Sequence, residues 1–360
     1  MKKLLFLNWL LLGLLVAPVL TSCSDDEEET PDVPEPTGKY TFNSGIQSAP
    51  TVDVSGWTWK DAELNNETPT VELEGTINEN VTLDASVKYK LTGAYIVADG
   101  YTLTIPGGTH IEVLVDENTE ATSVYIAVLM GGKIMINGTA DNPVVMSSVN
   151  GEPGDWGGLT ICGKAVTTAG VDATAEVGGF TYGGTNPADN SGSVTYLVIK
   201  GTGAAINSES QYNGVSLYAV GSATTFENIA VINGADDGIE FFGGSAEVTN
   251  IYLQDNEDDA VDWTEGWDGA VENTYIKHDV EGFSTAFEAD KDNMNPEFTN
   301  VTCVSTVGGT GLQFKKESGA TITGLYINGY DVELDMKDLG PTANVIVEGA
   351  AADVTEIPAE

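Results

Sequence analysis

The sequence repeats itself at an almost constant interval between residues 226 and 338. Five successive units each read as a strand, an acidic or glycine-containing turn, a second short strand and a glycine-rich turn; they begin at Phe226, Val248, Val271, Phe298 and Ile322. One column of the aligned units holds Asn228, Asn250, Asn273, Asn300 and Gly324, which are 22, 23, 27 and 24 residues apart. This interval is the length of one coil of a right-handed parallel β-helix rather than of one propeller blade. The repeat therefore predicts an all-β solenoid of single strands stacked coil on coil, with an N-terminal cap.

The second short strand of each unit predicts which side chains face the core. Successive side chains of a strand point to opposite faces, so apolar columns face inward and the column between them faces outward. The predicted inward columns are Ile239, Val261, Phe283 and Leu312, and Phe241, Trp263, Thr285 and Phe314. The predicted outward column is Glu240, Asp262, Ser284 and Gln313.

The N-terminal residues have the organisation of an export signal. Lys2 and Lys3 precede an apolar run that ends at about Leu20, followed by small residues. The ending LTSC at Cys23 resembles the bacterial lipobox, in which the cysteine becomes the first residue of the mature chain and carries the lipid, such as palmitate. The acidic run 25–29 resembles the signal that sends lipoproteins of Bacteroidota-type bacteria to the outer face of the outer membrane; a generic acidic spacer is the alternative.

Composition and repeat together divide the chain into five segments. The expected segments are a signal peptide in 1–22, a lipidated cysteine and acidic, proline-rich tether in 23–39, an N-terminal cap and first strands in 40–99, the β-helix in 100–345, and a C-terminal strand and tail in 346–360. Cys162 and Cys303 lie in apolar, strand-like stretches, and their spacing does not decide whether they form a disulfide.

The charge balance excludes several classes of partner. The chain has 14 basic and 55 acidic residues, a formal net charge of -41, and every basic residue is a lysine. Nucleic acids and anionic membrane surfaces repel such a protein. Without arginine, the bidentate recognition of acidic sugars is also absent. Cations and neutral sugars remain as candidate ligands.

Acidic residues are concentrated in the stretch from residue 234 to 271. In the aligned units Asp236 and Asp237 lie over Asp258 and Asp259, and Glu240 lies over Asp262. Stacked charges about 5 Å apart repel by about 3 kcal/mol at an effective dielectric constant near 20, so protonation, exposure to water or a cation must relieve them. Ca²⁺ prefers six to eight oxygen ligands. The predicted ligands are Asp236, Asp237, Glu240, Asp255, Asp258, Asp259 and Asp262. Acids turned into water are the competing interpretation.

The same stretch supports two functional hypotheses. Asp237 or Asp259, paired with Glu240 or Asp262, would be the acid and base of a glycoside hydrolase acting on a neutral polysaccharide. Exposed aromatic rings would instead stack on a bound glycan, with Trp263 reserved for the core. The candidate ligand-binding aromatics are Trp267, Tyr182, Tyr212 and Tyr218.

Several motifs resemble those of a family of exported Bacteroidota β-helix proteins. They include GDWGGLTICGKA (154–165), YNGVSLYAVG (212–221), ADDGIEFFGG (235–244) and DNEDDAVDWTEGWDG (255–269). The resemblance covers about residues 100–335 and implies a right-handed parallel β-helix at the cell surface, but no established activity. We therefore expect a surface protein anchored in the outer membrane through its lipid and facing the extracellular side. Its expected role is non-catalytic, binding a glycan or another surface protein, with glycoside hydrolysis as the alternative.

Overall fold

The computed structural model describes residues 71–114, 120–207, 210–291, 295–336, 344–347 and 350–351. All of them belong to one compact unit, residues 36–360. The predictions for the signal peptide 1–22, for Cys23 and the tether 23–39, and for residues 40–70 lie outside the described residues.

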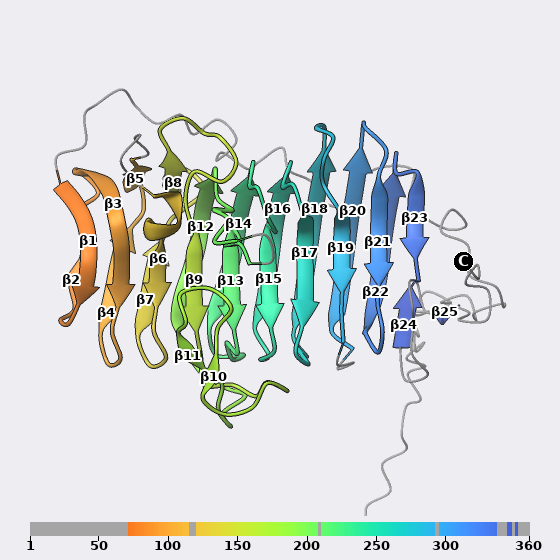
Figure 1. Ribbon diagram of the computed structural model, residues 1–360, viewed down its shortest axis with the longest axis horizontal. Coiled ribbons are helices and arrows are strands. Elements are labelled where there is room, and N and C mark those ends of the chain that lie inside the picture. Colours follow the sequence, from red (N-terminus) through yellow and green to blue (C-terminus); the bar gives the residue numbers. More distant parts are fainter. Residues whose placement is uncertain are drawn as a thin grey trace, which may run out of the picture. The chain divides into compact units, whose positions relative to one another are not determined.

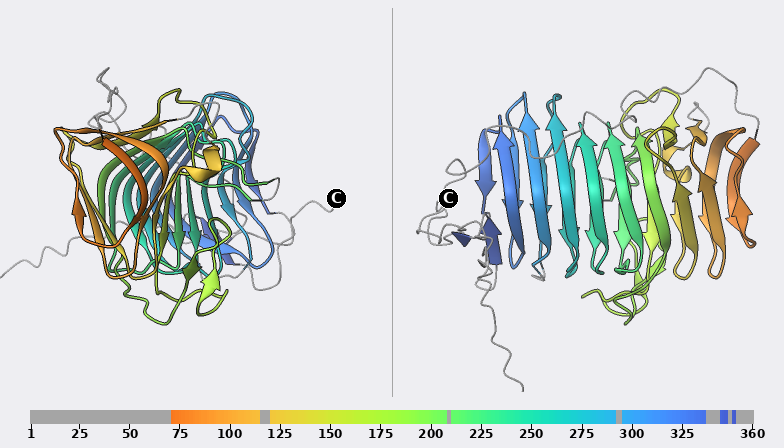
Figure 2. Two further views of the ribbon diagram at one scale, coloured as in Figure 1. Left: turned by 60° about the vertical axis from the view of Figure 1, so that its left-hand side comes forward. Right: turned by 180° about the vertical axis from the view of Figure 1, so that it is seen from behind.

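Strands stack in parallel to form three faces around a common interior (Figures 1 and 2). Face A contains β2 (Val81–Thr82), β4 (Thr102–Pro106), β7 (Lys133–Asn137), the first parts of β12 (Gly192–Lys200), β14 (Thr225–Ile232), β16 (Glu247–Gln254), β18 (Ala270–His278), β20 (Glu297–Ser305) and β22 (Gly319–Asn328), and then β24 (Asn344–Val347). Face B contains the first parts of β1 (Val71–Ile77) and β3 (Lys88–Val97), β5 (His110–Val113), β8 (Val144–Ser148) and the second parts of β12 to β22.

Face C is built from the short strands. It contains the ends of β1 and β3, then β6 (Ile126–Val128), β9 (Leu159–Cys162), β13 (Val215–Tyr218), β15 (Ile239–Phe242), β17 (Asp259–Thr264), β19 (Thr285–Ala289), β21 (Thr310–Phe314) and β23 (Val332–Asp335). The remaining elements are a 3₁₀ turn at Ala121–Ser123, the hairpin β10 (Ala173–Thr174) and β11 (Thr181–Tyr182), and β25 (Ala350–Ala351), which pairs antiparallel with β24. The prediction of a right-handed parallel β-helix is confirmed.

The asparagine column forms the corner between faces A and B. Asn228, Asn250, Asn273 and Asn300 all have left-handed backbone conformations, with φ between 58° and 62°. Asparagine tolerates this conformation better than other residues with a side chain, and Gly324 replaces it at the last corner. The amides also hydrogen-bond from coil to coil, each Nδ2 donating to the Oδ1 of the preceding asparagine at 2.9 to 3.0 Å. The column found in the sequence is therefore a structural ladder.

The regular coils begin inside the segment that was predicted to hold the cap and the first strands. β1 already pairs in parallel with β3 along two faces, so the described part of the predicted cap, from Val71, belongs to the β-helix. One apolar core runs inside the coils from Leu73 to Val347. Cys162 and Cys303 are both buried and free, so they do not form a disulfide.

The predicted columns are correct for three of the four coils, including the one with Leu312, Gln313 and Phe314, and wrong for one. Ile239 pairs with Val261, and Phe241 with Trp263, as expected. The next coil instead contributes Phe287, Glu288 and Ala289, in place of Phe283, Ser284 and Thr285. Between paired strand positions, the segment from Lys277 to Phe287 is longer than its counterpart from Gln254 to Val261, and Phe283 lies in it, stacked on His278 with ring centroids 3.7 Å apart. Because Phe283 is apolar, it was aligned with the first inward residue of the strand, although it lies in the turn.

One long insertion interrupts the coils. Residues 163–191, which we call the excursion, connect β9 to β12 and carry the β10–β11 hairpin (Figure 1). Its buried residues Ala175, Val177 and Tyr182 form a small apolar cluster with Tyr218 and Phe242 of face C. The excursion is therefore packed on the outer side of face C.

Candidate functional site

A polar column lies along the outer side of face C. Strand register places Thr160, Ser216, Glu240, Asp262, Glu288, Gln313 and Asp335 on successive coils. Thr160 and Ser216 are buried where the excursion packs, whereas Glu240, Asp262 and Glu288 are partly exposed. The three carboxyl groups are accordingly presented side by side, just beyond the edge of the excursion.

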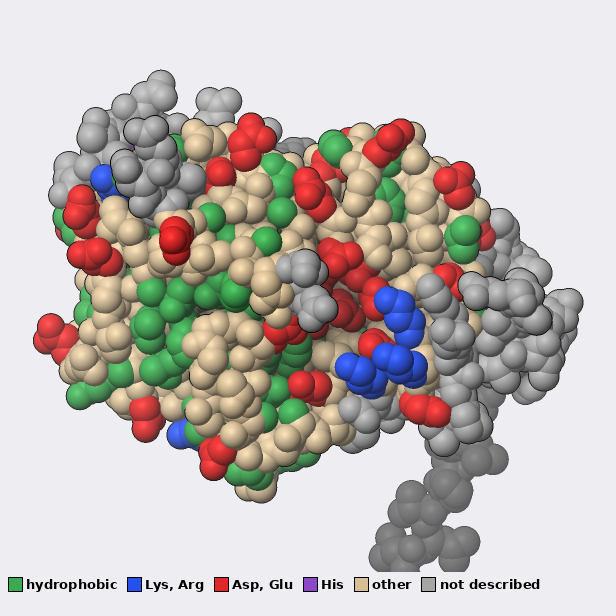
Figure 3. All heavy atoms as spheres, viewed as in Figure 1, with side chains coloured by type: hydrophobic (Ala, Val, Ile, Leu, Met, Phe, Trp, Pro, Cys, Tyr) green, Lys and Arg blue, Asp and Glu red, His purple; other side chains and the backbone are tan. Residues whose placement is uncertain are grey.

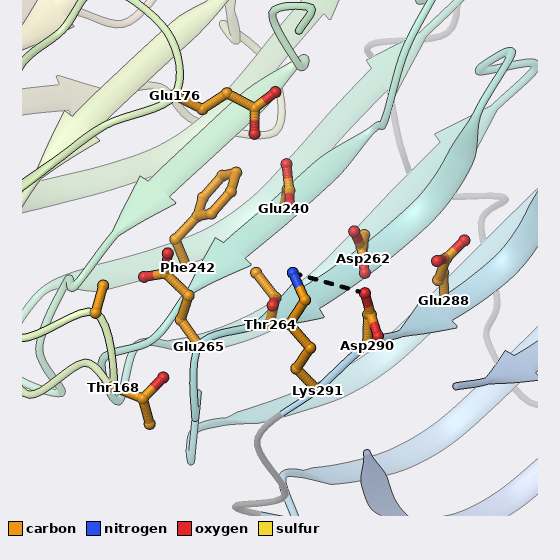
Figure 4. Close-up of a pocket in the computed structure, with 11 residues that line it drawn as sticks. Thr168, Glu176, Glu240, Phe242, Asp262, Thr264, Glu265, Glu288, Asp290 and Lys291 are labelled. Carbon is orange, nitrogen blue, oxygen red and sulfur yellow. Dashed lines mark ion pairs between the residues drawn. The ribbon is translucent and has the colours of Figure 1, made fainter. Parts of the chain in front are cut away.

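A cleft of about 410 Å³ opens over these carboxyl groups (Figures 3 and 4). Its floor comes from β15, β17 and the end of β19, and its wall from the excursion. The lining residues are Thr168, Ala169, Glu176, Glu240, Phe242, Asp262, Thr264, Glu265, Glu288, Asp290 and Lys291. Figure 3 shows acidic side chains gathered in this hollow, with lysines beside them. A cavity of this size can hold a small ligand or a few sugar units.

A second cavity of about 230 Å³, which we call the acidic pocket, adjoins the cleft. It is lined by Glu176, Gln211, Asp236, Asp237, Glu240, Asp258 and Asp262. Glu176, Glu240 and Asp262 line both cavities. Six of the seven side chains are carboxylic acids, and no lysine is among the described residues that line the pocket.

The carboxyl oxygens of the acidic pocket form two groups of three that have Asp237 in common, and the oxygens of each group lie close enough to share one ion. Oxygens of Asp236, Asp237 and Asp258 lie within 4.8 Å of one another, and so do those of Asp237, Glu240 and Asp262. Calcium binds oxygens at about 2.3 to 2.6 Å, so two ligands of one ion are separated by at most about 5 Å. The arrangement fits Ca²⁺ without a large rearrangement.

Burial and mutual repulsion disfavour the ionised form of these acids. Burial raises the pKa of Glu240 well above its usual range, and neighbouring Asp262 raises it further. The pKa of Asp262 is raised by burial and then by Glu288, and that of Asp236 is raised to about 8 by burial and then by Asp258. The Oδ1 atom of Asp262 is buried and has no hydrogen-bond partner in the described part of the chain.

Amide donors from the same region hold two of the acids in place. Asn213 Nδ2 donates to Glu240 Oε2 at 2.6 Å, and Gln211 Nε2 donates to Asp236 Oδ1 at 3.2 Å. The backbone amide of Asp259 donates to Asp237 Oδ1 at 2.9 Å, which links the turns of two coils. The carboxyl groups are therefore positioned by the fold rather than dispersed into water.

The structure brings together five of the seven predicted metal ligands. Asp236, Asp237, Glu240, Asp258 and Asp262 all line the acidic pocket.

The other two predicted ligands lie elsewhere. Asp259 is buried behind the pocket and accepts a hydrogen bond from Thr285 Oγ1 at 2.6 Å. Asp255 lines a separate cavity, and its Oδ1 accepts the backbone amides of Asp279 and Val280. Neither residue lines the acidic pocket: Asp255 binds the turn of the following coil, and Asp259 binds the first residue of β19.

The predicted exposed aromatics are buried. Trp267, Tyr182, Tyr212 and Tyr218 have only 1 to 2% of their surface exposed. Trp267 stacks on Phe241 in the core, with ring centroids 3.9 Å apart, and the three tyrosines belong to the apolar cluster under the excursion. Their assignment as a sugar-stacking surface is wrong. Trp263, expected in the core, is buried.

Two functional candidates were missed from the sequence. Glu288 was hidden by the misplaced register, although the alternation in TAFEA places it between two inward residues. It forms an ion pair with Lys315. Glu176 belongs to the excursion, which has no counterpart in other coils, and no sequence signal places it at the cleft.

A hydrogen-bonded group, which we call the latch, joins the excursion to face C. Tyr182 Oη donates to Glu265 Oε2 at 2.7 Å, and Thr167 Oγ1 donates to the same oxygen at 2.7 Å. Glu265 follows β17, so one carboxylate fixes two points of the excursion beside the cleft.

Lys291 also lines the cleft, and it forms an ion pair with Asp290 at 3.8 Å (Figure 4).

Comparison with known proteins places this architecture in a family. No helix among the described residues is long and apolar enough to cross a membrane. Searches of curated proteins and of solved structures found no match. A family model described as a pectate-lyase-like beta helix domain matches residues 75–357, which includes all three faces, the excursion and both cavities. The chain belongs to the pectate-lyase-like β-helix family.

Proposed function

We propose that this protein binds a neutral glycan in its cleft and that a calcium ion in the acidic pocket organises the floor of that cleft. The observation that carries the proposal is the acidic pocket itself, where six carboxyl groups line one small cavity with no lysine among its described lining residues. Such a group of acids is stable near neutral pH only with protons or a cation bound.

Calcium suits the pocket better than other common metals. The pocket offers carboxylate oxygens and the side-chain oxygen of Gln211, which are the hard ligands that Ca²⁺ prefers. Zinc favours histidine and cysteine, and neither lines the pocket among the described residues. Mg²⁺ demands a smaller octahedral shell and retains its waters, so a crowd of protein carboxylates suits it less well.

The adjoining cleft supports a sugar as the ligand. Glu240, Asp262, Glu288 and Thr264 offer hydrogen-bond acceptors for sugar hydroxyls along the direction of the stacked coils. An ion held by Glu240 and Asp262 would also be accessible from the cleft, because both residues line the two cavities. The negative charge of the floor disfavours acidic sugars. The family model is described as pectate-lyase-like, and pectate is a polysaccharide, so the family supports a polysaccharide as the class of ligand; because pectate is acidic, the preference for a neutral glycan rests on the charge of the floor alone.

The cellular setting of the proposal rests on residues outside the described part. The lipobox-like end at Cys23 and the acidic run after it support attachment to the outer membrane, facing the extracellular side. A lipid-anchored protein there would meet glycans or other surface proteins as an adhesion or interaction module.

Thermal unfolding tests the calcium site first. The protein lacking its predicted signal is heated with Ca²⁺, with Mg²⁺ and with EDTA, together with Asp237→Asn and the control Glu272→Gln, an exposed residue of face A. We expect Ca²⁺ to raise the midpoint of the wild type and the control, and not that of Asp237→Asn, because only a bound ion stabilises the folded state. Absence of any Ca²⁺ effect on the wild type would sink the metal proposal. A glycan array with and without Ca²⁺ then tests the cleft.

One observation favours glycoside hydrolysis as a second candidate. Burial raises the pKa of Glu240, which favours a proton on its carboxyl group, whereas Glu288 forms an ion pair with Lys315. They lie two coils apart, about 9.6 Å between strands, which is near the carboxyl separation of about 6.5 to 9.5 Å in inverting hydrolases. Asp237 and Asp259, predicted as catalytic partners, have 6% and 3% of their surface exposed and do not line the cleft.

The two candidates make opposite predictions for Ca²⁺. A proton donor at Glu240 must be protonated, and a bound cation would ionise it, so Ca²⁺ should inhibit hydrolysis and promote binding. Release of reducing ends from neutral polysaccharides, measured in EDTA and in Ca²⁺ for the wild type and Glu240→Gln, separates them. Hydrolysis in EDTA that is lost in Glu240→Gln would establish the enzyme.

A further inference from the structure

A third cavity, which we call the corner pocket, opens where face B turns into face C. Its volume is about 270 Å³, and it shares no lining residue with the cleft or the acidic pocket. It is formed by the segments that follow β8, β14, β16 and β18. Its lining includes three apolar side chains, those of Pro153, Val280 and Phe283. A cavity of this size has room for one ring-sized group rather than for a chain of sugars.

Phe283 presents an aromatic ring to the corner pocket, and one face of this ring is already supported. That face is stacked on His278, with an angle of 3° between the rings. Tyr330 lies 5.9 Å from the ring centroid of His278 and 6.1 Å from that of Phe283, so it borders the edges of both rings and not the outer face of Phe283. Because Phe283 is partly exposed and lines the pocket, its outer face is the one available to a ligand.

The supporting ring carries no charge near neutral pH. His278 is fully buried, and burial lowers its pKa to about 4. A protonated imidazole behind Phe283 would oppose a cation on the other face of the ring, and a neutral imidazole does not. The outer face of Phe283 therefore keeps the negative potential that attracts a cation.

The rim of the corner pocket is acidic and lacks a counter-charge. Glu152, Glu257 and Glu281 are exposed, and none of them forms an ion pair with another described residue. The fourth carboxyl group, that of Asp255, already accepts two backbone amides of the next turn. No lysine is among the described residues that line the pocket. An ammonium group in the pocket would thus find carboxylates that accept charge-assisted hydrogen bonds.

The spacing of these acids favours an organic cation over a metal ion. A metal ion requires converging oxygens, but neither group of acids whose oxygens lie within 4.8 Å of one another contains a residue of the corner pocket. Val280, with 57% of its surface exposed, adds apolar surface to the same pocket as Phe283. An amino sugar matches both features, because its ring carries C–H groups that stack on an aromatic face and its free amine is cationic.

We propose that the corner pocket binds an amino sugar whose amine is not acetylated. The sugar ring lies against the outer face of Phe283, and the ammonium group contacts the carboxylates of Glu257 and Glu281. This site is separate from the cleft and gives the protein a second sugar specificity. The segment from Lys277 to Phe287, which departs from the repeat, supplies the ring of this site.

Calorimetric titration with a short glucosamine oligomer and with its N-acetylated counterpart tests the proposal. The buffer contains Ca²⁺ and about 0.15 M salt, which screens attraction between charges that are not in contact. The wild type is compared with Phe283→Leu, Phe283→Tyr and Glu281→Gln. The controls are Glu272→Gln on face A and Glu240→Gln in the cleft. Thermal unfolding without sugar shows that each variant is folded at the temperature of the titration.

We expect the glucosamine oligomer to bind the wild type, Phe283→Tyr and both controls with similar affinity. Its affinity should fall about tenfold in Phe283→Leu and about threefold to tenfold in Glu281→Gln, and the acetylated oligomer should bind the wild type at least about tenfold more weakly. Should Phe283→Leu fail to fold, Glu281→Gln, at an exposed position, carries the test.

Three results would overturn the corner pocket as an amino-sugar site. The first is equal affinity of the wild type for the two oligomers, and the second is no binding of the glucosamine oligomer. The third is binding that is lost in Glu240→Gln and unchanged in Phe283→Leu or Glu281→Gln, which would place the amine in the cleft. None of these results decides whether the acidic pocket binds Ca²⁺, because the two cavities share no residue.

Discussion

Glu240 and Asp262 pair in register on neighbouring coils of face C, and both carboxyl groups line the cleft as well as the acidic pocket. Parallel strands place identical positions about 4.8 Å apart, so an acidic residue repeated in one column must face its own copy. The amide of Asn213 binds one of these acids, and the other has an unpartnered buried oxygen. The repulsion between these two carboxyl groups is therefore not fully offset by hydrogen bonds, and it acts where the two cavities meet.

Neutralising one member of the pair should stabilise the protein without a cation. In EDTA at pH 8, Asp262→Asn should raise the free energy of unfolding by about 1 to 3 kcal/mol, because it removes repulsion from Glu240 and Glu288. In Ca²⁺ the wild type should instead have the higher free energy of unfolding, because the variant has lost a ligand of the ion. Urea unfolding in the two buffers measures both effects.

Asp335→Asn is the matched control for this change. Asp335 occupies the same column beyond Gln313, accepts a hydrogen bond from its Nε2 at 2.7 Å, and lines neither cavity. Its replacement should not produce stabilisation in EDTA. A loss of stability in Asp262→Asn under EDTA would show that the acids are well solvated and that repulsion is unimportant.

The raised pKa values predict how stability depends on pH. The pKa of Asp236 is about 8 in the folded protein and near 4 in an unfolded chain, so the folded state binds more protons between these values. The unfolding free energy in EDTA should therefore fall as pH rises from about 4 to about 8 and then level off. Saturating Ca²⁺ should weaken this dependence, because the ion replaces the protons. Denaturation curves at pH 5, 6.5, 8 and 9 measure it, and stability that rises with pH over this range would contradict the assigned shifts.

The repeat and the corner residues could be predicted because every coil must satisfy the same backbone requirement. A left-handed corner favours asparagine or glycine, with Tyr196 at the corresponding corner of β12 as an exception, and inward positions must be apolar, so period and columns are visible in one sequence. Turn length is not constrained in this way. The longer segment from Lys277 to Phe287 shifted the alignment by four residues, and Phe283 in that segment concealed Glu288.

The cleft itself could not be predicted from the repeat. Its wall is a single insertion, and the position of Glu176 depends on how the hairpin packs rather than on a periodic signal. The prediction that certain aromatic residues are exposed was wrong for a related reason. Trp267 follows Gly266 and looked like a turn residue, yet its ring fills space beside Phe241 that the strands leave open. Packing between turns and core is decided by volume, which the pattern of residue types does not reveal.

The asparagine ladder should carry measurable stability. Asn250→Ala should lower the free energy of unfolding by about 2 to 4 kcal/mol, because alanine is strained at a φ of 60° and the hydrogen bonds to Asn228 and Asn273 are lost. Asn250→Gly should cost less, since glycine adopts this conformation without strain. Urea unfolding of both variants tests the order. Equal losses would assign the whole effect to the hydrogen bonds.

Trp267 should contribute to stability and not directly to ligand binding. Trp267→Ala should cost about 3 to 5 kcal/mol of unfolding free energy, the usual loss for a large aromatic side chain removed from a core, whereas Trp267→Phe should recover much of it. Unfolding in urea gives these values. At a temperature where Trp267→Phe is fully folded, its affinity for any glycan found on the array should equal that of the wild type. A selective loss of glycan binding with unchanged stability would instead return Trp267 to the surface role first expected of it, and would require the ring to leave Phe241.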